Sequence, residues 1–228
     1  MERRTFLKSL PALTMLAGAA AAMDEAPPPD ISPIDLPAPE KDGGLSVMAA
    51  LWERKTIRTI SSRPLPPQTL SNLLWAAFGV NRDQMPDGRP GRTAASATNA
   101  QEIDLYVALP GGVYLYEAVP HRLAPVAAGD FRASAGQDGV DKAPVNLFFV
   151  ADPTRFKRKG PAGAGATDAE KSFYNVDTGL IAQNVHLFAA SQGLAAWFHT
   201  CDQEKTPELF RLRPEQRVLF AQSVGYPE

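Results

Sequence analysis

Two polar blocks of the chain carry side chains that could together bind a phosphorylated heterocycle. The first is basic and the second is rich in hydroxyl and amide groups: Arg54, Lys55, Thr56 and Arg58, then Ser96, Asn99 and Gln101. A guanidinium group binds phosphate through charge-assisted, often paired hydrogen bonds. A side-chain amide offers a donor and an acceptor together, which suits the edge of a heterocyclic ring. This combination indicates a site for an anionic ligand that contains a ring.

The elements that must position these blocks follow from the spacing of apolar residues. A helix that begins at Ser46 would place Arg54 and Arg58 one turn apart. Further helices are expected at 68–78, 169–192 and 204–212. Strands are expected at 103–109 and 113–117, joined as a hairpin, and at 145–150, 195–199 and 217–224. This order predicts an α+β fold in which helices flank a mainly antiparallel sheet.

More motifs follow downstream of the two polar blocks. They are the pattern Asp-x-Gly-x-x-x-Gln-Asn at Asp177, Gly179, Gln183 and Asn184, the pair Gly193-Leu194, and Val-Gly-Tyr-Pro at 224–227. With R-x-[ST]-x-R at 54–58 and S-x-x-N-x-Q at 96–101, this series resembles the nitroreductase family of flavoproteins, and most closely its SagB-type dehydrogenase branch. The similarity runs from about residue 45 to the C-terminus. Each motif is weak by itself, whereas the ordered set is specific.

The resemblance implies a nitroreductase-like homodimer that binds FMN at the subunit interface. The phosphate and ribityl chain would contact Arg54, Lys55, Thr56 and Arg58. Polar contacts to the flavin would come from the partner subunit, through Ser96, Asn99 and Gln101. The helix end and the strand that pass the isoalloxazine ring would contribute Gly193, Leu194, Thr200 and Cys201. Of these, Thr200 and Cys201 would lie near the reactive N5 atom.

Each of these blocks also has a purely structural interpretation. The basic run could be the solvated face of a surface helix, and the Ser/Asn/Gln segment could be a turn before a strand. Gly193 could cap a helix, with Leu194 in the core. Cys201 could be a small buried apolar residue. The order of the motifs favours flavin binding for the first two blocks, whereas core packing is favoured for Cys201.

The sequence departs from the family pattern at three places. Cys201 stands where family members commonly have glycine, and Glu102 follows the motif glutamine where proline is common. Many relatives carry a lysine or arginine after the final strand, where it helps to bind the phosphate, but Glu228 is found there in this sequence. That role is then vacant or falls to Arg92 or Arg63.

Composition limits the alternatives. The 228 residues are 44% hydrophobic, which suits one globular domain with a sizeable core. Basic and acidic residues number 23 and 25, and the basic run at 157–159 lacks interleaved aromatic residues, so nucleic-acid binding is not expected. One cysteine and three scattered histidines indicate neither a disulfide framework nor a metal site.

The N-terminus reads as a targeting segment. Residues 2–8, E-R-R-T-F-L-K, match the twin-arginine export pattern, and an apolar stretch to Ala22 follows. This stretch is too short and interrupted to be a stable membrane span. We expect a signal peptide at 1–22, a proline-rich linker or arm at 23–44 and the folded domain at 45–228, in the periplasm. An ordinary basic N-terminus or an uncleaved anchor is the alternative.

The sequence therefore predicts an exported FMN-dependent oxidoreductase. It would move hydride or electron pairs through flavin N5 to or from a small conjugated substrate, such as a nitroaromatic or a quinone. The branch resemblance leaves a second possibility, the oxidation of an azoline ring in a modified peptide. A third is a non-catalytic protein that binds flavin or another ligand.

Overall fold

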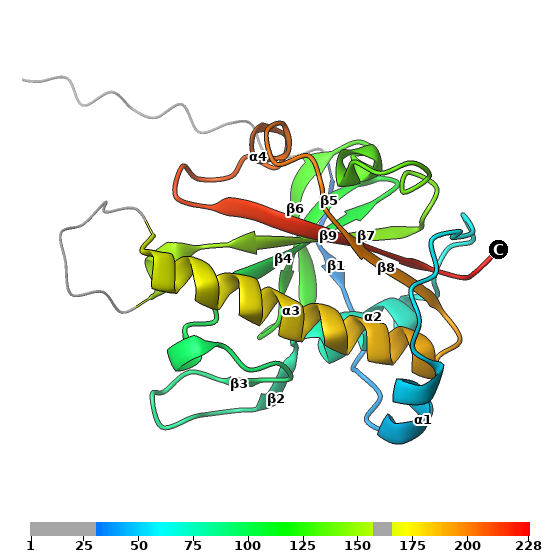
Figure 1. Ribbon diagram of the computed structural model, residues 1–228, viewed down its shortest axis with the longest axis horizontal. Coiled ribbons are helices and arrows are strands. Elements are labelled where there is room, and N and C mark those ends of the chain that lie inside the picture. Colours follow the sequence, from blue (N-terminus) through cyan, green and yellow to red (C-terminus); the bar gives the residue numbers. More distant parts are fainter. Residues whose placement is uncertain (1–30, 157–165) are drawn as a thin grey trace, which may run out of the picture.

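The computed structural model describes residues 31–156 and 166–228, so the predicted signal peptide and the basic run at 157–159 lie outside the described residues. Within them, seven strands form one antiparallel sheet in the order β1-β6-β5-β4-β7-β9-β8 (Figure 1). These strands are β1 (Ile34–Asp35), β4 (Ile103–Leu109), β5 (Gly112–Glu117), β6 (Arg122–Ala128), β7 (Val145–Ala151), β8 (Ala195–His199) and β9 (Arg217–Gly225). A separate pair consists of β2 (Val80–Arg82) and β3 (Gly91–Arg92). The predicted α+β class, including the hairpin of β4 and β5, is confirmed.

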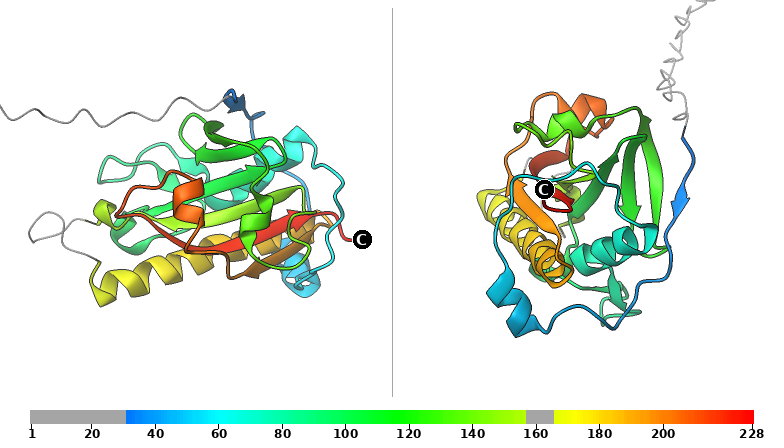
Figure 2. Two further views of the ribbon diagram at one scale, coloured as in Figure 1. Left: turned by 90° about the horizontal axis from the view of Figure 1, so that it is seen from above. Right: turned by 90° about the vertical axis from the view of Figure 1, so that its right-hand side faces the viewer.

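The helices lie on both sides of this sheet, as Figure 2 shows. They are α1 (Val47–Glu53), α2 (Pro67–Phe78), α3 (Asp168–Ser191) and α4 (Thr206–Leu209), with 3-10 turns η1 (Ala97–Asn99), η2 (Arg132–Ala135) and η3 (Pro153–Arg155). Helix α3 begins with a capping box, in which Thr167 and Glu170 satisfy each other's backbone N–H groups. None of the described helices is long and apolar enough to cross a membrane.

Strand β7 lies at the centre of the sheet and is buried on both faces. Alternate side chains point to opposite faces. Leu147 and Phe149 join the larger core beneath α2 and α3. Phe148 and Val150 join the smaller core on the other face, which includes Phe210 after α4. The near-continuous apolar run that predicted a buried strand therefore serves two cores at once.

Two predicted helices are shorter in the structure. Helix α1 ends at Glu53, so Arg54 and Arg58 do not lie on a helical face, and the prediction that they are one turn apart is wrong. The β-branched pair Thr56-Ile57 disfavours a helix, and the structure has neither helix nor strand at these residues. Helix α4 spans only 206–209, because the backbone of Arg211 is left-handed at φ 52°.

Of the two possibilities for the proline-rich segment, linker or arm, the described residues 31–44 have the form of an arm, because several of them bond to the domain. Strand β1 pairs with β6. Ser71 Oγ on α2 donates to the Pro37 carbonyl at 2.5 Å, and Gln68 Nε2 donates to Ala38 O at 2.9 Å. Proline suits such an arm, because it needs no N–H partner of its own. We call residues 31–44 the arm below.

Candidate functional site

The basic run crosses the end of the sheet beside β8. The Ile57 amide donates to the Ala196 carbonyl at 3.2 Å. The Arg58 guanidinium lies over the Trp197 ring, with 5.7 Å between its Cζ atom and the ring centroid. Further on, Ile60 bridges Pro227 after β9. The run is therefore fixed by backbone contacts, while its charged side chains point away from the core.

Three cations of this run have no acidic partner in the part of the chain that the structure describes: Arg54, Lys55 and Arg58 form no ion pair there. Lys55 and Arg58 are exposed. The positive charge of Arg54 acts on His186 of α3, whose pKa is lowered first by burial and then by that charge. Uncompensated positive charge of this kind suits a phosphate dianion. The residues present therefore fit the phosphate end of FMN.

Gly193 and Leu194 form a Schellman motif at the end of α3. Gly193 has φ 66°, and the Leu194 amide donates to Ala189 O at 2.8 Å. Leu194 is buried in the larger core. The structural interpretation of this pair is thus confirmed, and the motif sets the start of β8.

Thr200 and Cys201 lie at the opposite end of β8. The Thr200 carbonyl accepts a hydrogen bond from Gln137 Nε2 at 3.2 Å and lies 2.9 Å from His199 Nδ1. Gln137 also donates to Thr200 Oγ1 at 3.1 Å. Cys201 packs against the smaller core, and burial, followed by the charge of Asp202, raises its thiol pKa to about 12. Cys201 is therefore a neutral, packed thiol, and Gln137 is a positioning residue that no sequence motif indicated.

The second polar block forms a tight, strained loop around η1, at residues 96–101. Thr98, Asn99 and Gln101 all have left-handed backbones, with φ of 54°, 53° and 52°. Such conformations are costly for residues other than glycine. Side chains hold them: Ser96 Oγ accepts from the Gln101 amide at 2.9 Å, and Gln101 Nε2 donates to Pro90 O at 2.7 Å and to Asn99 Oδ1 at 2.9 Å. The block is a turn before a strand, as its structural interpretation predicts, but an unusually constrained one.

Arg92 and Arg63, the two candidates for the missing C-terminal cation, lie in different places. Arg92 Nε donates to Gln101 Oε1 at 2.7 Å and its guanidinium lies over Phe78, so it belongs to the loop of the second block. Arg63 lies over the Tyr226 ring, 3.9 Å from Cζ to centroid, a few residues beyond the basic run. Of the two, Arg63 is the one that lies near the basic run in the sequence.

The basic run and the Ser/Asn/Gln loop do not meet within one chain. The loop is tied to α3 where Ala97 N donates to Asp177 Oδ2 at 2.8 Å. The charge of Arg54 acts on His186, which follows Asp177 by nine positions on α3, roughly 13 Å along the helix axis. In Figure 1 the β2–β3 pair lies near the first half of α3, whereas α1 lies by its end. The two polar blocks therefore lie at different points along α3.

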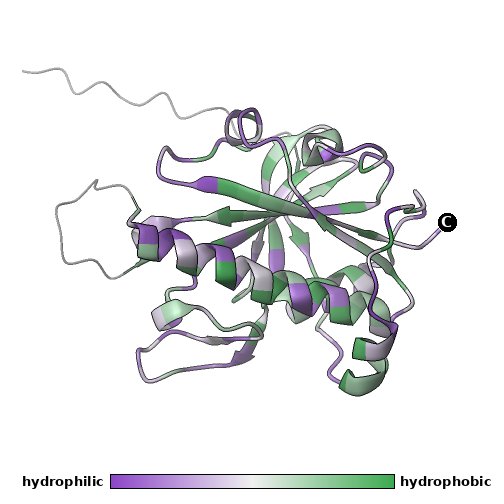
Figure 3. Ribbon diagram, in the orientation of Figure 1, coloured by the Kyte–Doolittle hydropathy of each residue, from purple (hydrophilic) through white to green (hydrophobic). Residues whose placement is uncertain are grey.

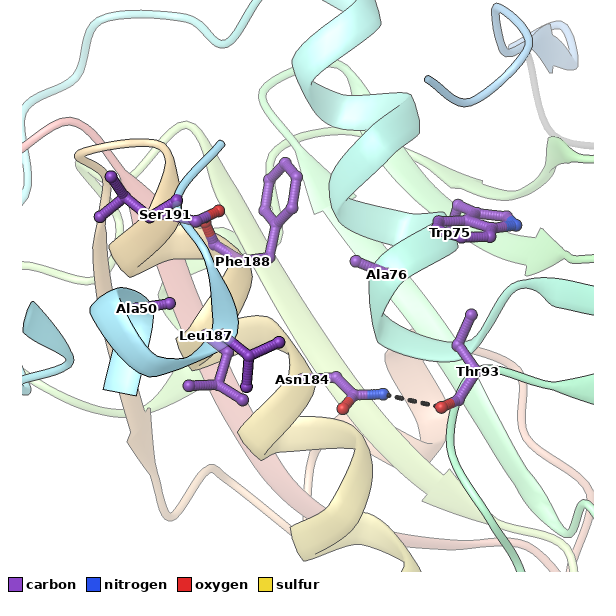
Figure 4. A pocket seen from close by; sticks show the side chains of 10 residues that line it. Ala50, Trp75, Ala76, Thr93, Asn184, Leu187, Phe188 and Ser191 are labelled. Carbon is purple, nitrogen blue, oxygen red and sulfur yellow. Dashed lines mark hydrogen bonds between the residues drawn. The ribbon is translucent and has the colours of Figure 1, made fainter. Parts of the chain in front are cut away.

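Asn184, part of the downstream motif, joins three segments. Its Nδ2 donates to Thr93 O at 3.3 Å and Ala77 O at 3.4 Å (Figure 4). Asn184 and Thr93 are both among the residues that line a groove of about 320 Å³ between α1, α2 and α3. The groove is lined by Leu45, Val47, Ala50, Trp75, Ala76, Thr93, Asn184, Leu187, Phe188 and Ser191. The motif thus anchors the segment that leads to the Ser/Asn/Gln loop.

Among the described residues, no three His, Cys, Asp or Glu side chains are grouped to hold a metal ion. The α+β fold is that of a flavin-dependent class of oxidoreductases. Comparison with known proteins agrees: residues 51–226 match the model of the Nitroreductase family. The chain belongs to the nitroreductase family.

Individual relatives support this assignment. A crystal structure from Ralstonia eutropha JMP134, provisionally named a nitroreductase, is 36% identical with a TM-score of 0.76, covering 89% of this chain and 94% of that one. A protein of Methanocaldococcus jannaschii with a similarly provisional name is 28% identical over 176 residues, 72% of this chain and 82% of the relative. The NADPH:FMN oxidoreductase of Vibrio harveyi, solved with NAD⁺, shares the fold at 19% identity and a TM-score of 0.57, covering 80% of this chain and 69% of that one.

Proposed function

We propose that the protein is an FMN-dependent oxidoreductase in which the basic run holds the phosphate. The observation that carries this is that Arg54, Lys55 and Arg58, in the segment that contacts β8, form no ion pair with any described residue, in a chain of the nitroreductase family. Bound flavin would supply the two-electron chemistry. The protein's part is to orient the ring along β8 and to exclude water. Thr200 and Cys201, at the far end of that strand, would face the ring.

The site is proposed to be completed by a second copy of the chain. Apolar side chains are exposed on two neighbouring helices: Val47, Met48, Leu51 and Trp52 on α1, and Phe173, Val176 and Leu180 on α3. Figure 3 shows apolar residues interspersed with polar ones along both helices. Monomeric proteins seldom leave such patches uncovered. A two-fold contact there would bring the loop of one protomer towards the basic run of its partner.

The proposed substrate is a small conjugated acceptor or donor, such as a nitroaromatic or a quinone. No side chain needs to act as acid or base, because Cys201 stays protonated and substrate protons can come from water. The roles of Asp177 and Asn184 in anchoring the loop and its approach favour membership of the SagB-type branch, in which an azoline ring of a modified peptide is the alternative substrate.

The protein is further proposed to be exported by the twin-arginine route. The support is the sequence pattern at residues 2–8. Replacing Arg3 and Arg4 by lysine should retain the protein in the cytoplasm, as measured by cell fractionation and immunoblotting. Periplasmic recovery of that double variant would contradict the proposed route.

Native mass spectrometry of the purified protein tests the cofactor. We expect the mass of FMN on the protein and a yellow solution that bleaches on reduction and recovers colour with a quinone or nitroaromatic. Bound flavin that bleaches but is reoxidised by none of a panel of such substrates would indicate a carrier. Colourless protein that does not take up added FMN would refute the proposal.

A further inference from the structure

Glu102 is a fully buried acid that forms no ion pair with the described residues. It directly follows the Ser/Asn/Gln loop, and its side chain has 0% exposure. Neither carboxyl oxygen has a hydrogen-bond partner in aligned geometry among the described residues. A buried carboxylate without partners is strongly disfavoured, so such a group takes up a proton. The structure therefore places a carboxylic acid, and not a carboxylate, behind the loop at neutral pH.

Taken together, the charged groups around Glu102 also favour its protonated form. Asp177 of α3, which is itself buried, interacts with it, and Arg155 of η3 is the cation that acts on it. Arg155 is already shared, since it pairs with Asp104 at 2.7 Å and with Asp152 at 3.4 Å. Burial first, and then Asp177, raise the pKa of Glu102 to about 8, against the opposing effect of Arg155.

Asp177 is also the acid that holds the loop. Its Oδ2 accepts from Ala97 N, which is the hydrogen bond that joins η1 to α3 in the described chain. The same loop carries the left-handed residues Thr98, Asn99 and Gln101. A strained loop persists only where its surroundings fix it. The charge on the Glu102–Asp177 pair therefore bears directly on the conformation of the loop.

We infer that Glu102 is a positioning residue whose proton lets Asp177 hold the loop, so that loss of this proton at alkaline pH releases the loop and weakens flavin binding. The inference rests on the proposed function, because it takes the Ser/Asn/Gln loop as part of the FMN site. With one proton, the pair carries a single negative charge. Without it, two buried carboxylates repel each other, and the cheapest relief is for the loop to move away from α3 and admit water.

The test is the dissociation constant of FMN between pH 6.5 and 9.5, followed by quenching of flavin fluorescence. The wild type is compared at each pH with Glu102→Gln, which cannot ionise, so that any titration of the flavin itself cancels in the ratio. We expect similar affinities at pH 6.5, where Glu102 is protonated. At pH 9.5 the wild type should bind FMN at least about tenfold more weakly than Glu102→Gln, because this pH lies more than one unit above the Glu102 pKa of about 8. The surface variant Glu117→Gln should follow the wild-type profile.

Asp177→Asn keeps an acceptor for Ala97 but removes the charge, so its FMN affinity should also be flat with pH. It serves in place of Glu102→Gln should that variant fail to fold. A pH-independent ratio, in proteins that do bind FMN, would overturn this inference and leave the proposed function standing. If neither wild type nor variants bind FMN at any pH, the proposed function fails and this inference fails with it.

The cofactor-free protein gives a second readout. Because the folded pKa of Glu102 is raised above its ordinary value of 4.5, its contribution to stability is complete below pH 4.5 and is lost as pH rises towards 8. The unfolding free energy of the wild type, measured by urea titration relative to Glu102→Gln, should therefore fall across this interval and be constant above it. A constant difference from pH 4.5 to 8 would show that Glu102 is already ionised.

Discussion

Arg58 has two features that suit a phosphate site beside a β-strand. Its guanidinium lies over the Trp197 ring and it has no acidic partner in the described chain. Stacking holds the planar group in place without neutralising its charge. The charge therefore remains available to a ligand, and the side chain loses little freedom when the ligand binds.

Arg58→Ala should weaken FMN binding by roughly 10- to 150-fold, because a charge-assisted hydrogen bond contributes about 1.5–3 kcal/mol. Isothermal titration with FMN measures this. Lys205→Ala removes an equally positive, exposed side chain elsewhere and should leave the affinity unchanged. Equal affinities for wild type and Arg58→Ala would move the phosphate away from this residue.

Residue types were predictable from the sequence here, but their partners were not. The Ser/Asn/Gln pattern indicated polar contacts to a ring, whereas in one chain Gln101 already bonds Arg92, Pro90 and Asn99. Such contacts depend on left-handed backbone at Thr98, which a β-branched residue rarely adopts and no local propensity predicts. The neutral state of Glu102 likewise arises from burial, which only the folded chain creates.

At the scale of elements, helix α3 organises the site. The Ser/Asn/Gln loop is hydrogen-bonded to α3 at Asp177, and the charge of Arg54 in the basic run acts on His186 of α3. The cap at Gly193 ends α3 and leads into β8. Its first turn is fixed by the capping box of Thr167 and Glu170. Removal of this cap should therefore lower the unfolding free energy of the domain without changing the residues of the site.

Thr167→Ala should reduce the unfolding free energy by about 1 kcal/mol, because it removes the N-cap acceptor. For a domain of this size the melting temperature should fall by about 2–4 °C in differential scanning calorimetry. Ser172→Ala, which removes a hydroxyl bonded only within the helix, is the matched control and should change little. A larger effect for Ser172→Ala than for Thr167→Ala would contradict the role of the cap.

His121 belongs to the hydrogen-bond network that holds the arm, and its protonation state affects this network. His121 lies between Tyr116 Oη, 2.9 Å from Nδ1, and Ser71 Oγ, 2.7 Å from Nε2. Because Ser71 donates to Pro37, it accepts from Nε2–H, and Nδ1 accepts from Tyr116. Burial lowers the pKa of His121, against the effect of the Pro37 carbonyl. Protonation of His121 would put a hydrogen on Nδ1, which is the atom that accepts from Tyr116 Oη.

Acid should therefore loosen the arm. Since the folded pKa of His121 is depressed, its contribution to stability is present above the ordinary value of 6.5 and is lost as pH falls below it. Hydrogen exchange of the arm amides at Leu36 and Glu40, corrected for intrinsic rates, should accelerate between pH 7 and 5. His121→Asn, which tolerates the left-handed backbone, should remove this dependence. Unchanged protection of the wild-type arm at pH 5 would refute it.

Elements with strong periodicity were predictable, including α2, α3 and the central strands. The segment 54–58 was predicted as helix because its charges have helical spacing, but the Ile57–Ala196 hydrogen bond gives its backbone a partner outside a helix. Strand β6 was not predicted, since Pro125 lies within it, opposite Tyr114 and next to an irregularity in register. In both cases a distant strand decided the local structure.

At the scale of the whole molecule, the separation of the two polar blocks along α3 is the main argument for a dimer. Leu180→Glu places a charge in the exposed apolar stripe of α3 and should convert a dimer to a monomer with much weaker FMN binding. Light scattering coupled to size exclusion, with flavin absorbance on the same run, measures both. Val119→Glu, at an even more exposed apolar position between β5 and β6, should preserve both. A monomeric wild type that retains full flavin would exclude the dimeric site.

At each border of the main sheet, a short segment of the chain adds backbone hydrogen bonds to a longer strand. Strand β1 lies along β6 on one side, and the chain at Ile57 bonds the Ala196 carbonyl of β8 on the other. Uncovered strand edges are where unrelated molecules add on and fibrils grow. Because these short segments already use backbone groups of β6 and β8, each border of the sheet offers fewer free positions to an added strand.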